Sequence, residues 1–67
     1  MVWNIYAHFP EGAYHVATST DSEHGLDFAA RVCEQMGVWP HAMSAIIPGE
    51  YVIRGPLFEL EDLRKRA

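Results

Sequence analysis

Two histidines near the N-terminus are the first residues whose type and spacing could do chemistry. His8 and His15 lie on two segments that we expect to pair as a hairpin, and in the expected register they face each other. Two imidazoles at that distance can share a zinc or nickel ion, but a closed zinc site needs four ligands and a catalytic one needs three. The sequence fixes no third ligand, because His24, His41 or an acid would have to arrive from elsewhere. We interpret the pair as part of a polar sheet face, with a His-based metal site as the alternative.

The remaining candidates for catalysis lack their partners. Cys33 is the only cysteine, and it lies on the apolar side of a predicted helix, where we expect an inert core thiol and not a nucleophile with a lowered pKa. The serines stand in no nucleophile-elbow context, and the glycines are scattered singly and form no phosphate-binding loop. The carboxylates fall on predicted turns and exposed helix faces. We therefore expect no catalytic residue, no cofactor and no enzyme.

The charge is distributed unevenly along the chain. Nine acidic residues face five basic ones, and three of the basic ones are Arg64, Lys65 and Arg66. Residues 1–63 therefore hold nine acids against Arg31 and Arg54, a net charge of −7. Such a body repels phosphate backbones, so direct binding of nucleic acid is disfavoured except through the basic tail. It suits a protein partner with a basic surface. The alternative is that the acids only keep a small protein in solution.

The candidate partner-binding residues are carboxylates on rigid elements and two aromatic side chains. Rows of carboxylates on helices are what a protein needs to imitate a phosphate backbone and occupy a basic channel. Tryptophan and tyrosine are enriched among interface hot spots, and one tyrosine shares the polar sheet face with the histidines. The predicted set is Glu23, Asp27, Glu34, Glu50, Glu59, Glu61, Asp62, Trp39 and Tyr6.

The N-terminal segments that carry the histidines alternate between apolar and polar residues. Residues 2–9 and 14–20 are therefore predicted strands, joined by a turn at 10–13. In the expected register Phe9 pairs with Tyr14, which places Thr18 on the apolar face. The predicted core residues include four aromatic side chains, Trp3, Phe9, Tyr14 and Phe28.

Apolar residues at steps of three and four predict a helix that ends at Gly37. A capping box is expected from Thr20 to Glu23, although Gly25 weakens the first turn and the helix properly begins near Leu26. Residues 38–45 are either a loop or a short helical turn at Pro40. A second hairpin is expected from 44–47 and 50–54, followed by a helix that begins at Pro56 and has an apolar edge of Leu57, Leu60 and Leu63.

These elements predict an α+β fold in one domain, residues 1–67. We expect a small antiparallel sheet in the order β-β-α-β-β-α, with one main helix packed on one face and a short C-terminal helix. The lone cysteine favours a reducing compartment. No apolar run approaches the roughly 18 residues of a membrane span, and the N-terminus lacks the pattern of a signal peptide. The expected location is the cytoplasm, as a monomer or weak homo-oligomer.

In general character the chain resembles the small proteins that phages and mobile elements encode to block host defences, including anti-CRISPR proteins. The resemblance is carried by the short length, the α+β organisation, the acidic body and the lack of a catalytic motif. Anti-CRISPR proteins share no sequence signature, so no residue roles carry over. The resemblance implies a protein that docks on a CRISPR effector complex and obstructs access to target DNA, some members doing so as DNA mimics.

Two features depart from a strong DNA mimic, namely the modest overall charge and the basic end at residues 64–66. They leave open a steric mode in which the inhibitor only contacts protein. The alternative function is a structural, adaptor or homo-oligomeric interaction module of a phage or bacterium. A His-based metal-binding protein is the other alternative.

Overall fold

The elements of the computed structural model follow the predicted order β-β-α-β-β-α. The structure describes residues 1–50 and 53–67. The described elements are β1 (Trp3–Phe9), β2 (Gly12–Ser19), α1 (Ser22–Met36), β3 (Ala42–Ile46), β4 (Leu57–Phe58) and α2 (Leu60–Arg66). The predicted α+β class, with one main helix and a short C-terminal helix, is confirmed. Neither α1 nor α2 is long and apolar enough to cross a membrane.

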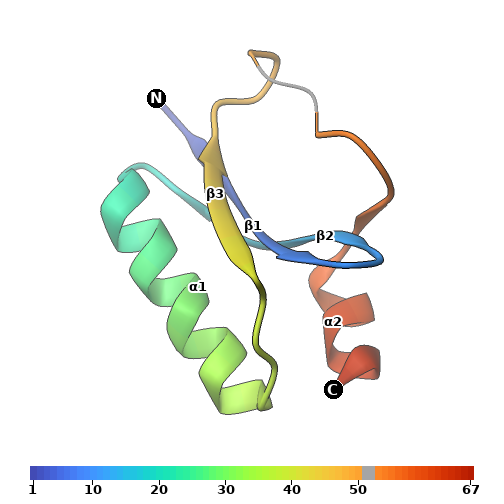
Figure 1. Ribbon diagram of the computed structural model, residues 1–67. Helices are drawn as coiled ribbons and strands as arrows, with labels where there is room; N and C mark the ends of the chain where they lie inside the picture. Colours follow the sequence, from blue (N-terminus) through green and yellow to red (C-terminus); the bar gives the residue numbers. More distant parts are fainter. Residues whose placement is uncertain (51–52) are drawn as a thin grey trace.

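The four strands form one sheet in the order β3-β1-β2-β4 (Figure 1). The central strand β1 pairs antiparallel with both β2 and β3, whereas β4 pairs parallel with β2. The sheet is therefore mixed and not purely antiparallel as predicted. The reason is the connection after β3, which crosses from one edge of the sheet to the other and reaches β2 in the same chain direction. Parallel pairs need such a crossover.

The hairpin register differs from the predicted one by two residues. Phe9 pairs with Gly12 and Ala7 pairs with Tyr14, so the loop consists of residues 10 and 11 alone. A side chain at Gly12 would place its Cβ 2.5 Å from the carbonyl oxygen of Pro56, and the backbone φ there is +153°. Gly12 is thus needed for the close approach of the segment before β4 as well as for the turn.

A β-bulge in β2 changes which residues face the core. Between Ile5 and Tyr6 on β1, the partner residue steps from Ala17 to His15, so Val16 is the extra residue. Bulges re-aim the side chains that follow them. Thr18 therefore pairs with Asn4 and is exposed, and its predicted place in the core is wrong.

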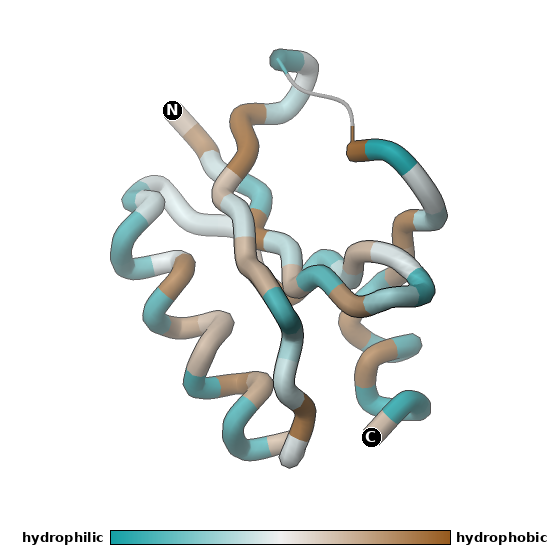
Figure 2. Tube along the Cα trace, in the orientation of Figure 1, coloured by the Kyte–Doolittle hydropathy of each residue, from teal (hydrophilic) through white to brown (hydrophobic). Residues whose placement is uncertain are grey.

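The core lies on the inner face of the sheet, which we define as the face that carries Ile5, Ala7 and Phe9. The outer face carries Asn4, Tyr6 and His8. Figure 2 shows hydrophobic and hydrophilic residues alternating along the chain in both helices and in the strands. Phe28 is 56% exposed, so its predicted core position is wrong. The core cluster consists of Ile5, Ala7, Phe9, Tyr14, Val16, Ala29, Cys33, Val38 and Leu63, and Trp3 is among the partly buried residues that pack against it.

The main helix α1 begins and ends at side-chain and backbone caps. The carboxylate of Asp21 accepts the backbone N–H of His24 at 2.9 Å, so the N-cap is Asp21 and neither the predicted Thr20 nor a start near Leu26 is correct. Gly37 ends the helix as predicted, with a φ of +73°. Val38 N–H donates to the carbonyl of Cys33 at 3.0 Å, which completes a Schellman motif and turns Val38 into the core.

Gly25 brings α1 close to the sheet. It is buried, and an added Cβ would lie 2.7 Å from Ile5 Cδ1 and 2.9 Å from Ser19 Cβ. Those separations are too short for carbon atoms in contact. The glycine is therefore a packing requirement and not the weak point of the first turn.

The second hairpin predicted from residues 44–47 and 50–54 does not form in the described residues. β3 pairs with β1, and Ile53 and Arg54 are not in a strand. The predicted strand residues Tyr51 and Val52 lie outside the described residues. The stretch 38–45 was predicted as a loop or a short helical turn, and both alternatives are wrong over residues 42–45, which belong to β3.

The C-terminal helix begins at Leu60 and not at Pro56, because residues 57–58 pair with β2 as β4. A capping box starts α2, in which the Asp62 carboxylate accepts the backbone N–H of Glu59 at 3.0 Å. Leu63 is fully buried, whereas Leu57 is 56% exposed. The predicted apolar edge is therefore only partly turned to the core.

A cluster of polar and aromatic groups fastens the end of α2 to the hairpin. Arg66 forms an ion pair with Glu11, and its guanidinium carbon lies 3.9 Å from the centre of the Phe9 ring. The hydroxyl of Tyr14 donates to the same carboxylate at 2.7 Å. The hydrogen bonds from Arg66 and Tyr14 lower the pKa of Glu11 to about 2.

This cluster predicts an acid-dependent loss of stability. Because the folded pKa of Glu11 lies below its ordinary value of 4.5, its contribution is present above pH 4.5 and is lost as the pH falls toward 2. In Glu11→Gln, the free energy of unfolding should fall less steeply across this window than in the wild type. The measurement is urea unfolding at a series of pH values. Glu34→Gln is the control, since it removes an equal charge from the exposed face of α1, and its profile should run parallel to the wild type. A parallel profile for Glu11→Gln would contradict the assignment.

Candidate functional site

The exposed side of α1 carries three carboxylates in a line. Glu23, Asp27 and Glu34 are all exposed, and their spacing of four and seven residues places them within about 40° of one another around the helix. They span about 16 Å along its axis. We call these three residues the acidic row. Arg31 lies beside it and contacts Asp27 at 3.0 Å, but both side chains are more than 60% exposed, so the pair adds little stability.

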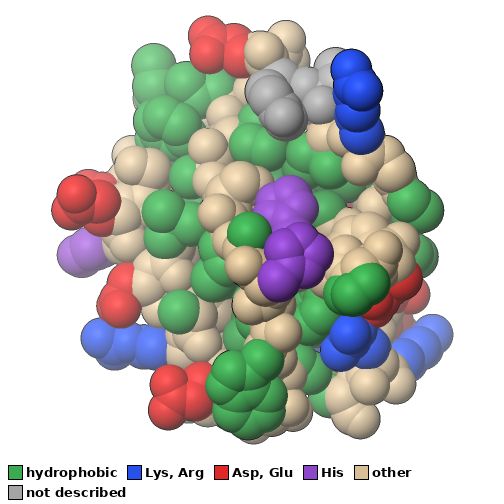
Figure 3. Space-filling model, in the orientation of Figure 1, with side chains coloured by type: hydrophobic (Ala, Val, Ile, Leu, Met, Phe, Trp, Pro, Cys, Tyr) green, Lys and Arg blue, Asp and Glu red, His purple; other side chains and the backbone are tan. Residues whose placement is uncertain are grey.

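The row ends at an exposed tryptophan. Trp39 is 75% exposed, so its side chain is accessible to a partner. It lines a groove of about 440 Å³ between α1 and β3, to which Glu34 and Met43 also contribute. Figure 3 shows acidic side chains spaced along α1, one basic side chain among them and a large apolar group at the lower end. The acidic row and Trp39 together are called the docking surface below.

The carboxylates of α2 are in a different place. Figure 1 shows α1 and α2 separated by the strands of the sheet. Asp62 is engaged in the capping box, and a Glu59 oxygen lies 3.9 Å from His15 Nδ1. Glu61 is exposed on the same helix, and Glu50 lies in the turn after β3. The predicted acidic set is therefore divided, and only its α1 members share a face with Trp39.

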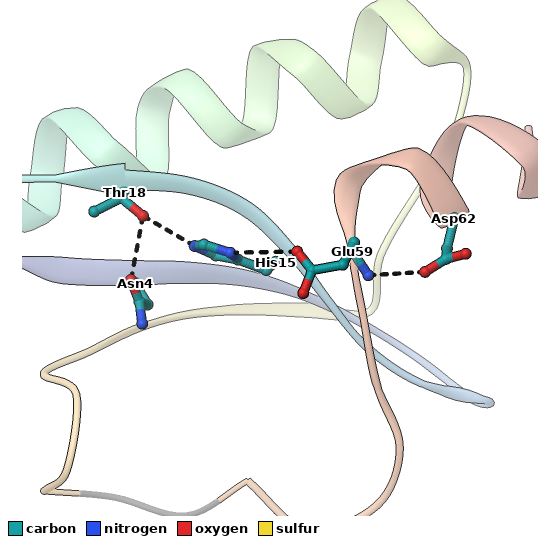
Figure 4. A network of polar contacts seen from close by, with 5 residues as sticks. All are labelled: Asn4, His15, Thr18, Glu59 and Asp62. Atoms are coloured by element: carbon teal, nitrogen blue, oxygen red, sulfur yellow. Dashed lines mark hydrogen bonds and ion pairs between the residues drawn. The ribbon is translucent and has the colours of Figure 1, made fainter.

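Tyr6 lies on the outer face, away from α1. Its ring is 5.3 Å from that of His15, which pairs with it across the hairpin. His15 lies between Thr18 and Glu59 in a chain of polar contacts (Figure 4). The hydroxyl of Thr18 donates to Asn4 at 3.2 Å. The outer face therefore carries a series of polar side-chain contacts. Tyr6 belongs to this face and does not lie on the docking surface.

The neighbour of His8 is His41, not His15. In the observed register His8 pairs with Ala13, and its Nε2 lies 2.8 Å from the hydroxyl of Ser44. Burial lowers the pKa of His8, and the nearby His41 lowers it further. Figure 3 shows two histidines side by side at the centre of the view. Among residues 1–50 and 53–67, no three His, Cys, Asp or Glu side chains gather closely enough to hold a metal ion.

Cys33 lies where the helix pattern predicts it. Its side chain is in the core and only 2% exposed. Burial raises the pKa of the thiol, which disfavours the reactive thiolate. The geometry thus favours a structural role for this cysteine.

The feature that sequence reasoning missed is the edge of β3. The strand lies at the end of the sheet order, next to the groove that holds Trp39. Pairing between distant segments has no local signature, although the uncharged run Ala42–Ile46 between two prolines was a signal for an edge strand. Comparisons of the chain with protein-family models, with curated proteins and with solved structures found no match. The interpretation of this surface therefore depends on its chemistry.

Proposed function

We propose that this chain is a non-catalytic inhibitor that binds a basic, nucleic-acid-handling protein through the docking surface and blocks access of target DNA. The observation that supports it is the acidic row on α1, which ends at the exposed Trp39. A CRISPR effector complex is the partner that the general resemblance suggests. The proposed setting is the cytoplasm of a phage host, where such complexes act.

The docking surface combines carboxylates that attract a basic partner with an exposed tryptophan that can be buried in the contact. Glu23, Asp27 and Glu34 carry the same charge on a helix that is capped at both ends, so the row is rigid. Like charges on a fixed element steer a basic partner and raise the rate of association. An exposed tryptophan supplies buried area upon binding, as hot-spot residues do. The two together suit a specific protein contact.

The acidic row has fewer carboxylates than DNA has phosphates over the same length, which favours steric obstruction over complete phosphate mimicry. One strand of DNA carries a phosphate about every 3.4 Å of axis, so about five phosphates occupy the 16 Å of the row. The row offers three carboxylates, and Arg31 pairs with one of them. The acids of α2 lie elsewhere and do not extend it. We therefore propose a protein-contact mode in which the acidic row provides steering.

Reversal of charge on the row should weaken binding of the partner. The partner is first identified by mass spectrometry after capture on N-terminally tagged protein from the native host. The double variant Asp27→Lys, Glu34→Lys should then bind it at least about tenfold more weakly, with a smaller salt dependence, because charges at an interface act on association. Titrations between low and high salt measure both quantities.

The matched control carries the same change in net charge elsewhere. Glu50→Lys with Glu61→Lys should alter the affinity by less than about threefold, because these residues lie off the docking surface. Equal losses in the two double variants would show that net charge and not the row matters. Unchanged affinity in Asp27→Lys, Glu34→Lys would contradict the proposal and favour an adaptor that binds without regard to salt.

A further inference from the structure

One edge of the sheet is open. β3 pairs with β1 along one of its sides, and in the described part of the chain no strand lies along its other side. In an antiparallel strand alternate residues turn their N–H and C=O groups to opposite sides. Half of the backbone polar groups of β3 therefore point away from β1. Such an edge can pair with another extended chain.

The two edges of this sheet are built differently. β4 has two residues, and a very short edge strand is a common protection against unwanted pairing. β3 has five residues, Ala42–Ile46, with no charged residue and no proline among them. Pro40 and Pro48 lie just outside it and limit the open edge to this stretch. The protection present on one edge is absent on the other.

We propose that β3 accepts an extended, basic segment of a partner protein as a fifth strand. The inference rests on the proposed docking function and names the part of the partner that would bind. Figure 1 shows α1 and β3 running side by side. The groove between them is lined by Glu34, Trp39 and Met43. Side chains of an added strand that point to the inner face would therefore enter this groove beside the acidic row.

The contact with the acidic row is expected at Glu34. Glu34 and Trp39 both line the groove beside β3, whereas Asp27 lies about 10.5 Å further along the helix axis. Alternate residues of a strand are about 6.6 Å apart on one face. A lysine or arginine of the added strand would thus meet Glu34, and a β-branched or aromatic residue would meet Trp39.

A second copy of the chain is a poorer occupant. Antiparallel pairing of two β3 strands would place the two α1 helices on the same face of the joint sheet, on either side of the contact. On each helix Glu34, the last residue of the acidic row, lines the groove beside β3. Like charges brought together in this way oppose association. Charge complementarity favours a basic segment of another protein.

The test uses octapeptides selected from a random displayed library on the immobilised full chain. The expected peptides alternate Lys or Arg with β-branched or aromatic residues. When such a peptide is bound, the amides of β3 that face away from β1 should exchange hydrogen at least about tenfold more slowly. No enrichment, or enriched peptides that leave exchange in β3 unchanged, would overturn the proposal. Protection of β3 that grows with protein concentration in the absence of peptide would assign the edge to a second copy and overturn it as well.

A pair of methylated peptides distinguishes strand addition from binding by side chains alone. Each selected peptide is made with backbone N-methyl groups at every second residue, in the two possible phases. One phase blocks the amides that face β3, and the other leaves them free. Strand addition predicts that one phase loses binding at least about tenfold while the other keeps it. Equal affinity of the two methylated peptides would contradict strand addition.

The role of charge is tested at Glu34. Glu34→Lys should weaken binding of the basic peptides by about fivefold or more, while Glu61→Lys, which makes the same change on α2, should leave it within about twofold. Equal effects of the two variants would overturn the basic character of the segment. This inference can fail separately from the proposed function. The captured partner could lose affinity for the charge-reversed variant and yet leave hydrogen exchange in β3 of the wild type unchanged. That result would support the proposed function and contradict the addition of a fifth strand.

Discussion

Replacement of Leu63 by alanine is expected to lower the free energy of unfolding by about 2–5 kcal/mol. Leu63 is fully buried and is the one residue of α2 in the core cluster. α2 has seven residues, too few for a helix to be stable by itself in water. Its stability therefore depends on this packing. In a 67-residue domain with a total stability of about 5–10 kcal/mol, the loss is a large fraction.

Urea unfolding followed by circular dichroism measures the effect, with Leu57→Ala as the matched control. Leu57 is 56% exposed, so the same truncation there should cost less than about 1 kcal/mol. Similar losses at both positions would show that Leu63 does not hold α2 in place. A docking surface that keeps its partner affinity in Leu63→Ala would be consistent with its location on α1, because none of its residues comes from α2.

Replacement of Gly25 by alanine is expected to lower the free energy of unfolding by about 1–3 kcal/mol. Alanine is better than glycine in a helix by about 1 kcal/mol, so propensity alone predicts the opposite sign. At Gly25 the steric clash outweighs helix propensity, so the change in the free energy of unfolding is expected to be destabilising. The new Cβ would lie within 3 Å of two side-chain atoms of Ile5, which is fully buried in the core, and of Ser19 Cβ, which is attached directly to the backbone. α1 would have to move away from the sheet.

The reverse change at Ala30 is the control for Gly25→Ala. Ala30 is exposed on the same helix, and Ala30→Gly should lower stability by about 1 kcal/mol through helix propensity. Thermal and urea unfolding of both variants give the comparison. If Gly25→Ala were more stable than the wild type, the close packing of α1 on the sheet would be contradicted.

Local patterns predicted much of the fold. Alternation located β1 and β2, and the three- and four-residue steps located α1 with its end at Gly37. What alternation cannot give is register, because a shift of two residues keeps every side chain on the same face. The bulge at Val16 then reverses the faces without any change in composition. The predicted pairing of His8 with His15 was wrong because of the two-residue shift in register, although both strands were correct.

The secondary structure predicted after α1 was partly wrong because strands there pair with segments distant in the sequence. Residues 44–47 and 50–54 form a plausible hairpin by turn chemistry, but β3 gains a partner by pairing with β1 instead. Residues 57–58 were predicted as the first turn of a helix because Pro56 suits that position, yet they pair with β2. Strand pairing between distant segments competes with local preference, and only the assembled sheet shows which one prevails.

The candidate site was predicted in part. Helical spacing alone places Glu23, Asp27 and Glu34 on one exposed face. Trp39 was predicted as a partner-binding residue from its type alone, and neither its exposure nor the groove beside it could be derived from the sequence. The sequence could not show that Glu59 and Asp62 take part in capping, nor that Tyr6 faces the other side of the sheet. Those distinctions depend on where α2 packs, which local patterns leave undetermined.

The long sequence separation between Glu11 and Arg66 has a consequence for the order of folding. The docking surface and its neighbouring strand use residues 22–46, and the hairpin that supports them precedes these residues. The contact that fastens α2 joins residues 55 positions apart, so it closes a loop that spans most of the domain. Contacts between residues close in sequence form faster than contacts across a long loop. We therefore expect the hairpin and α1 to come together before the contact between Glu11 and Arg66 closes.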